Sequence, residues 1–307
     1  MPGTLQRAYV AAHFALELDG DGTMGFLRSA DGGGLTTDIQ TYQPGHKLDL
    51  WRQVGRPKYG DITLQVGMGM SRAFYAWIAD FFNRKVTRKT GAIVGADFNF
   101  KERTRRTFSD ALISEVQLPA LDGSSKDAAL MTVKIVPESM EYKTIADGPR
   151  ILAPHHPHGN KLWHAANFRF TVDGFGDSFK RTTKIDQFTI KQQILEYQSG
   201  HRRTSTRVPG RVEHPNINVY VPEVDAEAIV AQANERLITY KKPGDGGMTG
   251  TIEFLTPDKQ TLCTINLKGV DIVSAEPQKL DASAEALALV KLQIQVEAME
   301  FVYPDGA

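Results

Sequence analysis

The sequence has little of what marks an exported, disulfide-bonded or membrane-bound protein. Its 307 residues include a single cysteine, Cys263, so the chain forms no internal disulfide and needs no oxidising compartment. No stretch reaches the roughly 18–20 apolar residues that cross a bilayer, and the N-terminus has neither a basic start nor a continuous apolar run. These absences predict a soluble protein without a visible export signal. Cys263 lies in an alternating run, and we expect it to be a buried small apolar residue rather than a nucleophile.

An excess of charge of either sign is also missing. Lys and Arg total 36, Asp and Glu total 36, and the formal net charge is zero. General binding to nucleic acid or to a membrane surface depends on a basic excess or patch, so this balance supports neither class. A net charge of zero also does little to oppose self-association.

What the sequence has instead is an internal duplication. Residues 61–82 have the pattern of a half-buried strand, a Gly-rich break and an amphipathic helix. Residues 216–237 repeat this pattern 154–155 positions later, with a weaker helical stripe. Ser71 and Asp225 are the expected starts of the two helices. We infer that one module was copied end to end.

Shorter motifs keep the same alignment. The motif Tyr-Gln-x-Gly-His occurs at 42–46 and again at 197–201, in segments that we expect to be long hairpins projecting from the sheet. Met140 and Met299 occupy equivalent places in the last strands and lie 159 positions apart. The second half has therefore gained about four residues upstream of its last strand.

The repeat predicts a mainly β protein built as two tandem antiparallel β-barrel or sandwich domains, each with one flanking α-helix. We expect domain 1 at residues 1–146 and domain 2 at residues 165–307. Residues 147–164 contain several prolines and no periodicity, so we expect them to be a linker.

Several finer features are expectations that a structure can test. A short strand is expected at Phe179–Thr182, and a charged hairpin tip at Lys101–Arg106. Each half is expected to close with one continuous strand, Met131–Tyr142 in the first half and Leu289–Phe301 in the second.

No convincing reactive constellation emerges, and we predict no catalytic, cofactor-binding or metal-binding residues. His155, His156 and His158, with His164 nearby, could bind a metal, but a proline-broken surface segment does not bring ligands together. Gly67-Met-Gly69 superficially suits a phosphate site at a helix start. It lacks the lysine of a P-loop and the third glycine of a dinucleotide fingerprint. We interpret these segments as a solvated linker and a structural turn.

The best enzyme alternative is Phe-Gly-Asp-Ser-Phe at Phe175–Phe179, which resembles the opening block of the GDSL-type esterases. A serine nucleophile needs a base, and in that family the base lies far downstream in an Asp-x-x-His pair. The last histidine here is His214, in Val-Glu-His-Pro, and no such pair follows Ser178. We therefore expect Ser178 to lie in a turn between strands.

Basic residues cluster in three short runs that could touch phosphates. They are Arg84–Lys89, Lys101–Arg106 and Arg202–Arg207. Solvated loops or a contact between subunits are the preferred explanation.

A series of motifs also occurs in a fixed order. The motifs are Asp19-Gly20 after an apolar strand, Gly25-Phe26, Tyr42, Gly45 and Gly-Arg-Pro-Lys-Tyr-Gly-Asp-Ile-Thr-Leu at 55–64. Their order, leading into Ser-Arg and an aromatic-rich helix, resembles the tail-tube proteins of contractile phage tails and of phage-tail-like extracellular injection systems. The resemblance covers about Ala11–Tyr142 well and Ala165–Phe301 more loosely.

The resemblance implies β modules that associate side by side into six-fold rings, which stack into a hollow tube, and it implies no catalysis or cofactor. Because this chain carries two modules where the common tube subunit has one, three chains would form a pseudo-six-fold trimer; a hexamer is the alternative. The implied role is a tube component, or an adaptor or initiator joining a three-fold hub to six-fold rings.

Expected partners are copies of the chain, neighbouring tube rings, and sheath or baseplate hub proteins, with no membrane. The lumen could carry nucleic acid or protein. The expected location is the cytoplasm during assembly and then a phage tail or extracellular injection particle.

A secreted effector or binding module is the competing class, and a GDSL-like esterase is less favoured. A secreted module should be a monomer, whereas a ring former should give trimers, hexamers or filaments. An esterase should lose activity on Ser178→Ala. A ring former should instead show assembly defects when hairpin Thr37–Trp51 or Lys191–Arg207 is shortened.

Overall fold

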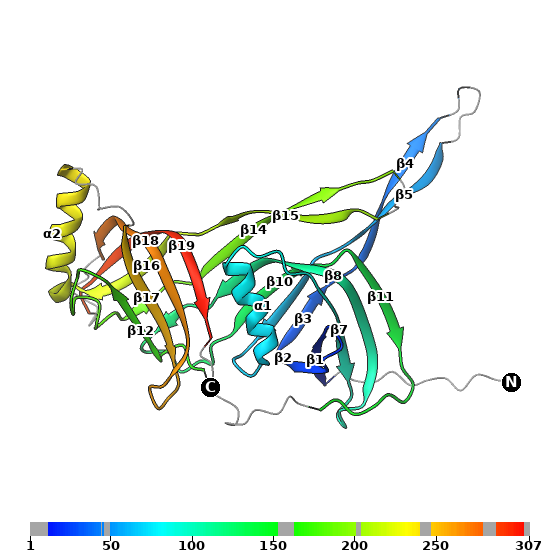
Figure 1. The fold of residues 1–307 in the computed structure, drawn as a ribbon, viewed down its shortest axis with the longest axis horizontal. Helices are drawn as coiled ribbons and strands as arrows, with labels where there is room; N and C mark the ends of the chain where they lie inside the picture. Colours follow the sequence, from blue (N-terminus) through cyan, green and yellow to red (C-terminus); the bar gives the residue numbers. More distant parts are fainter. Residues whose placement is uncertain are drawn as a thin grey trace, which may run out of the picture.

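A computed structural model describes residues 12–43, 45, 50–152, 163–200, 204–239, 247–278 and 287–303. These residues form two tandem, mainly β domains made of antiparallel sheets, each with one helix, as the repeat predicts (Figure 1). The sheets form sandwich-like layers, and no closed barrel occurs within these described ranges.

The first half contains eleven strands and one helix within its described residues. In chain order the elements are β1 (His13–Leu18), β2 (Thr23–Leu27), β3 (Ser29–Gly32), β4 (Leu35–Tyr42), β5 (Trp51–Tyr59), β6 (Ile62–Val66), α1 (Arg72–Phe82), β7 (Lys89–Ala96), β8 (Glu102–Leu118), β9 (Leu121–Asp122), β10 (Met131–Val136) and β11 (Ser139–Thr144). Strand β8 belongs to two layers. Its N-terminal part pairs with β7 and β11, and its C-terminal part pairs with β10, which leads on to β6 and β3.

Helix α1 follows from the apolar spacing in its sequence, which places one broad face of the helix against the sheets. The buried side chains are Phe74, Tyr75, Trp77, Ile78, Phe81 and Phe82. Ser71 precedes the helix in an extended conformation, but its hydroxyl lies against the sulfur of Met24 rather than capping a backbone N–H. The helix ends at Asn83, whose N–H donates to the carbonyl of Ala79.

The second half repeats this order. Its elements are β12 (Phe168–Val172), β13 (Lys184–Ile185), β14 (Phe188–Tyr197), β15 (Thr206–Glu213), β16 (Ile217–Pro222), α2 (Glu223–Thr239), β17 (Met248–Leu255), β18 (Thr261–Pro277) and β19 (Leu289–Val302). Ile62 faces Ile135 in the first half, and Ile217 faces Ile294 in the second. The two halves are thus offset by 155 residues up to β16 and by 159 in the last strands. The four extra residues lie between β16 and β17, in the segment that contains α2, which is 17 residues long against 11 for α1.

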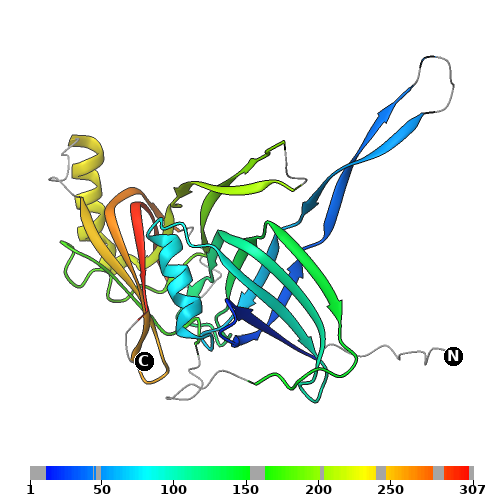
Figure 2. The ribbon, with the colours of Figure 1, turned by 45° about the vertical axis from the view of Figure 1, so that its right-hand side comes forward.

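Each half carries a long hairpin, and the two hairpins have the same register. The pairs of β14–β15, from Lys191 opposite Glu213 to Tyr197 opposite Thr206, all have counterparts 155 residues earlier in β4–β5, including the bulge. Hairpin β4–β5 projects alone from the molecule, whereas β14–β15 runs from the second half toward the first (Figures 1 and 2). The predicted long hairpins are therefore confirmed.

Strands of the two halves pair with each other, and apolar residues of both halves form a common core. Strand β14 pairs with β8 of the first half, and β9 of the first half pairs with β13 of the second. A single apolar cluster includes Leu64 and Phe74 from the first half and Ile217 and Phe301 from the second. The modules are consecutive in sequence but interlocked in space.

The expected strand at Phe179–Thr182 is wrong, because this segment folds as successive turns. The N–H of Lys180 donates to the carbonyl of Asp177, and the N–H of Thr182 donates to that of Phe179. Phe179 is buried and packs edge-on against Phe170. The apolar residue that suggested a strand fills the core from a turn.

Two boundaries are also corrected. Residues 102–106 belong to strand β8 rather than to a hairpin tip, because Arg105 pairs with Glu17 of β1 and Arg103 pairs with Asp97, just after β7. The expected strand Met131–Tyr142 is broken at Pro137–Glu138 into β10 and β11, each pairing with a different part of β8. Its counterpart β19 is continuous, as expected.

Candidate assembly surfaces

The contact between the two halves is a strand addition. Strand β14 pairs antiparallel with the C-terminal part of β8, with Ile190 opposite Val116 and Lys191 opposite Glu115. Ile190 and Val116 are both fully buried. Adding a hairpin to a sheet edge gains main-chain hydrogen bonds and covers an edge that would otherwise be open.

Arg207 of β15 anchors this added hairpin. It is only 9% exposed; its guanidinium pairs with Glu196 at 2.6 Å and donates to the carbonyl of Tyr59 at 3.2 Å. Its backbone N–H donates to Glu138 at 3.0 Å, and Glu138 is in turn paired with Arg88 at 2.6 Å. Arg88 also donates to the carbonyl of Arg207. Charge-assisted bonds of this kind are about twice as strong as neutral ones.

A second contact near the junction joins Arg56 at the base of β5 to Gln198 at the end of β14. The Arg56 guanidinium donates to the amide oxygen of Gln198 at 3.0 Å. The tip of the second hairpin therefore docks on the base of the first.

Helix α1 supplies a third contact, against the end of β19. The ring of Tyr75 stacks on that of Tyr303 with centroids 4.5 Å apart, and Phe82 lies 5.8 Å from Phe301. The Tyr75 hydroxyl donates to the carbonyl of Gly67, and burial raises the pKa of Tyr75 well above its usual value.

The counterparts of these docked surfaces are open. On β4–β5, Leu35 is 63% exposed and Ile39 is 65% exposed, and Trp51 and Val54 are also exposed. On the first half, Tyr142, the counterpart of Phe301, is 64% exposed. Large apolar side chains gathered on a projecting hairpin mark an interaction surface.

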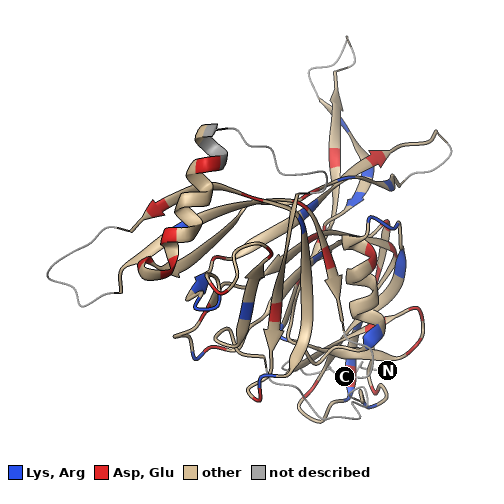
Figure 3. Ribbon diagram, turned by 60° about the vertical axis from the view of Figure 1, so that its left-hand side comes forward, with Lys and Arg blue, Asp and Glu red and all other residues tan. Residues whose placement is uncertain are grey.

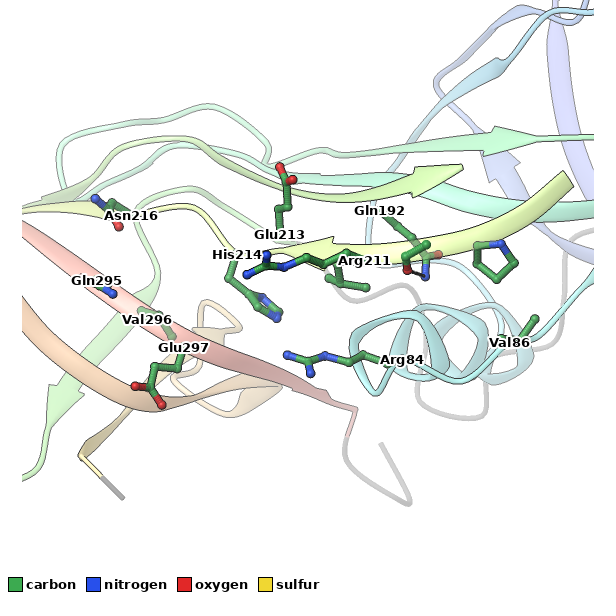
Figure 4. Close-up of a pocket in the computed structure, with 13 residues that line it drawn as sticks. Arg84, Val86, Gln192, Arg211, Glu213, His214, Asn216, Gln295, Val296 and Glu297 are labelled. Carbon is green, nitrogen blue, oxygen red and sulfur yellow. Dashed lines mark hydrogen bonds between the residues drawn. The ribbon is translucent and has the colours of Figure 1, made fainter. Parts of the chain in front are cut away.

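A cavity of about 850 Å³ lies at the base of β15, between that strand, β19 and the end of α1. Its lining includes Arg84, Arg211, His214 and Glu297, and in Figure 4 His214 lies between Arg211 and Arg84. Neither ring nitrogen of His214 has a hydrogen-bond partner within the described part of the chain. Burial, and then the charge of Arg84, lower the pKa of His214.

The structure does not bring the weighed esterase residues together. Ser178 lies in the turns after β12, where its N–H donates to the carbonyl of Phe175. His214 lines the cavity at the base of β15, and Ser178 is not among the residues around that cavity. The pair has no common site.

The other candidate site residues considered from the sequence are a cysteine, two glycines and four histidines. Cys263 is buried in β18, and burial raises the pKa of its thiol, as for an inert core cysteine. Gly67 and Gly69 lie between β6 and α1. His155, His156 and His158 lie outside the described residues. His164 forms an isolated bridge with Ala128, and no group of three potential metal ligands occurs among the residues that the structure describes.

All three basic runs contribute ion pairs within the fold. Arg105 pairs with Glu17 at 2.7 Å and with Glu102 at 2.6 Å, and Arg103 pairs with Asp97 at 2.9 Å. Arg88 of the first run and Arg207 of the third meet at the junction of the two halves, while Arg202 and Arg203 lie outside the described residues. Figure 3 shows the basic and acidic residues interspersed along the strands and loops. Neither described helix is long and apolar enough to cross a membrane.

The comparison with protein families follows the duplication. The model of the T4-like virus tail tube protein gp19 family matches twice, over residues 10–141 and over residues 165–300. The chain therefore belongs to the tail tube protein family and carries two copies of its module, which confirms the resemblance noted in the sequence. The family consists of structural tail components rather than enzymes. A comparison with curated proteins found no match.

Three solved structures illustrate what this chain is similar to. One is from the PVC sheath-tube complex of an extracellular contractile injection system in the extended state, with 19% identity and a TM-score of 0.40, covering 46% of this chain and 95% of that one. One is from the tube-terminating cap of the anti-feeding prophage, with 21% identity and a TM-score of 0.41, covering 46% and 95%. One is from the anti-feeding prophage baseplate, with 13% identity and a TM-score of 0.35, covering 44% and 91%.

Sequence reasoning missed the junction itself. It identified the hairpins and allowed a subunit contact for the basic runs, but not the pairing of β14 with β8. The available signal was Glu138, which lies in a motif shared by the two last strands, together with Arg207 in the basic run beside the second hairpin.

Proposed function

We propose that this protein is a structural, non-catalytic component of a phage tail or contractile injection particle, which assembles into a closed ring with a central channel. The observation that carries the proposal is the asymmetry of the two hairpins. They share one register, yet β14–β15 extends the sheet of a neighbouring module, whereas β4–β5 pairs with no further strand in the described part of its own chain.

The chain accordingly has one complete junction and two unmatched halves of another. Among the described residues, its first module offers a hairpin that extends no sheet. Its second module offers the counterpart of the β8 edge, on β18, to which no described hairpin is added. Such a head-to-tail surface joins successive copies and closes into a ring when the rotation per step allows it.

Six modules per ring, as the family resemblance implies, would need three chains. We propose such a trimer with pseudo-six-fold symmetry, in which residues 1–146 and 165–307 are the two modules and 147–164 connect them. A three-fold ring of six modules suits a tube component, or an adaptor or initiator between a three-fold hub and six-fold tube rings. Neighbouring rings and sheath or hub proteins are the proposed further partners, with assembly in the cytoplasm and cargo in the lumen.

The test is the mass of the purified full-length protein in solution, measured by light scattering over a hundredfold range of concentration. A particle of three chains, or a larger assembly built from it, supports the proposal. A monomer at every concentration contradicts it and favours a free-standing secreted module.

A further inference from the structure

We propose that the cavity at the base of β15 is a socket for the outer end of hairpin β4–β5 from a second copy of this chain. In that socket the Arg52 backbone N–H of the second copy would meet Glu297, and its guanidinium would meet the carbonyl of His214. This inference rests on the proposed ring and specifies the surface that joins its chains. We call the cavity lined by Arg211, His214 and Glu297 the socket.

The first module contains an equivalent site, which hairpin β14–β15 of the same chain occupies. In the first module, the base of hairpin β4–β5 and the start of β11 receive the tip of β14–β15. The Arg207 guanidinium donates to the carbonyl of Tyr59, the Arg207 backbone N–H donates to the carboxylate of Glu138, and Gln198 accepts from Arg56. This occupied site defines what a docked tip contacts.

The residues of this occupied site have counterparts in the unmatched hairpin and in the second module, which the offsets of the duplication identify. The hairpin offset of 155 converts Arg207 to Arg52 and Gln198 to Gln43. On the receiving side, Arg56 becomes Arg211 by the same offset, and Glu138 becomes Glu297 by the offset of 159. All four pairs keep the residue type.

One further residue of the occupied site, Tyr59, has a counterpart of a different type but with the same hydrogen-bonding role. Tyr59 corresponds to His214, but Tyr59 contributes only its backbone carbonyl to Arg207. A carbonyl is available at any residue, so the substitution leaves the acceptor in place. The socket thus retains these five groups, but Arg88 of the first module corresponds to Gly247 by the offset of 159 and has no equivalent cation.

In the second module, the equivalent receiving site is an open cavity. His214, Glu297 and Arg211, the counterparts of the groups around the docked tip, all line the cavity of about 850 Å³ (Figure 4). Glu297 is exposed, and so is Arg52 on the projecting hairpin. An exposed cation and an exposed anion at equivalent places on the two unmatched surfaces are electrostatically complementary.

The strand pairing beside the socket can be specified by the same transfer. Ile190 opposite Val116 converts to Leu35 opposite Ala275, and Lys191 opposite Glu115 converts to Thr36 opposite Ser274. In the described residues, this end of β18 pairs with β19 along one edge only, and Leu35 is 63% exposed. Docking would cover both the edge and the side chain.

Cysteine cross-linking tests the register in the full-length protein. Leu35→Cys with Ala275→Cys should form disulfides between chains on mild oxidation, giving bands of up to three chains on a denaturing gel. Thr36→Cys with Ala275→Cys is the matched control, because a shift of one residue turns the side chain to the other face of the strand. Ile190→Cys with Val116→Cys is the in-chain positive control for the same geometry.

Charge reversal tests the socket contacts. Arg52→Glu removes the guanidinium donor to the His214 carbonyl, and Glu297→Arg removes the acceptor of the Arg52 N–H. Each should raise the concentration needed for half-maximal assembly by about ten- to a hundredfold. Arg169→Glu, at the far edge strand β12, should leave assembly unchanged.

The outcomes separate this inference from the proposed ring. If the wild-type protein forms rings but Leu35→Cys with Ala275→Cys does not cross-link while the in-chain pair does, the inference is overturned and the ring stands. Unchanged assembly of both Arg52→Glu and Glu297→Arg also overturns it. If the wild-type protein never assembles, the ring proposal fails first.

Discussion

At the scale of single residues, the duplication allows the role of one copy of a side chain to be compared with that of the other. Arg207 and Arg52 occupy the same place in two hairpins of identical register. Arg207 is almost completely buried at a junction, whereas Arg52 is exposed. The difference lies in what each hairpin meets, because the residue type and the local strand pairing are the same.

Removing the buried arginine should loosen the junction. We expect Arg207→Ala to lower the free energy of unfolding by about 2–3 kcal/mol, because it leaves Glu196 and the Tyr59 carbonyl without a charged donor. Urea unfolding at low protein concentration measures this. The control Arg169→Ala removes an exposed pair with Glu253 and should cost less than about 1 kcal/mol. Equal effects of the two substitutions would contradict the account of the junction.

His214 should make stability depend on pH in the mildly acidic range. Its pKa in the folded chain is depressed by burial and by Arg84, while Arg211, Glu213 and Glu297 also line its cavity. Below the usual pKa of 6.5, the unfolded chain takes up a proton that the folded chain does not, so stability is complete above that pH and falls as pH decreases toward the folded pKa.

The measurement is urea unfolding of the wild type and of His214→Gln at pH 7.5 and pH 5.5. The wild type should lose up to about 1 kcal/mol more than the variant between the two conditions, since the imidazole is only half-buried. The same loss in both proteins would rule out His214 as the source.

At the scale of elements, the two hairpins should respond differently to the same shortening. Removing residues 38–52 from β4–β5 should leave folding intact, because this part of the hairpin projects alone, but should abolish assembly (Figure 2). Circular dichroism and light scattering report the two properties separately.

Shortening β14–β15 by the equivalent residues 193–207 should instead destabilise the chain, because it removes Arg207 and loosens the hairpin that covers β8. The account would be contradicted if both deletions gave stable monomers with the same unfolding curve. It would also be contradicted if the β4–β5 deletion still assembled.

The helices and strands also show which structural features the sequence predicts and which it does not. The alternation in residues 61–66, the helical spacing of α1 and the matched hairpins were predicted correctly because they depend on local periodicity. The turns at 177–182 and the inclusion of Arg103 and Arg105 in β8 were not, because both depend on distant partners. Burial against Phe170 holds Phe179 in a turn, and acidic residues on other segments keep the arginines in the strand.

At the scale of the whole molecule, the pairing of β14 with β8 was the feature beyond reach of the sequence. Nothing in a hairpin's own residues states which sheet edge it extends, because main-chain pairing is open to any edge of suitable geometry. Once that pairing is known, the repeat identifies the equivalent residues on the two unmatched surfaces. In the proposed ring, each contact between the two modules within the chain predicts an equivalent contact between chains.

The central claim is that the two halves are equivalent neighbours in a closed ring, and imaging of the purified full-length protein tests it most directly. Averaged electron micrographs should show rings with a central hole and six lobes, which alternate between two slightly different forms so that the true symmetry is three-fold. Separate two-lobed particles at high concentration, or rings in which the two halves occupy different radii, would contradict the claim.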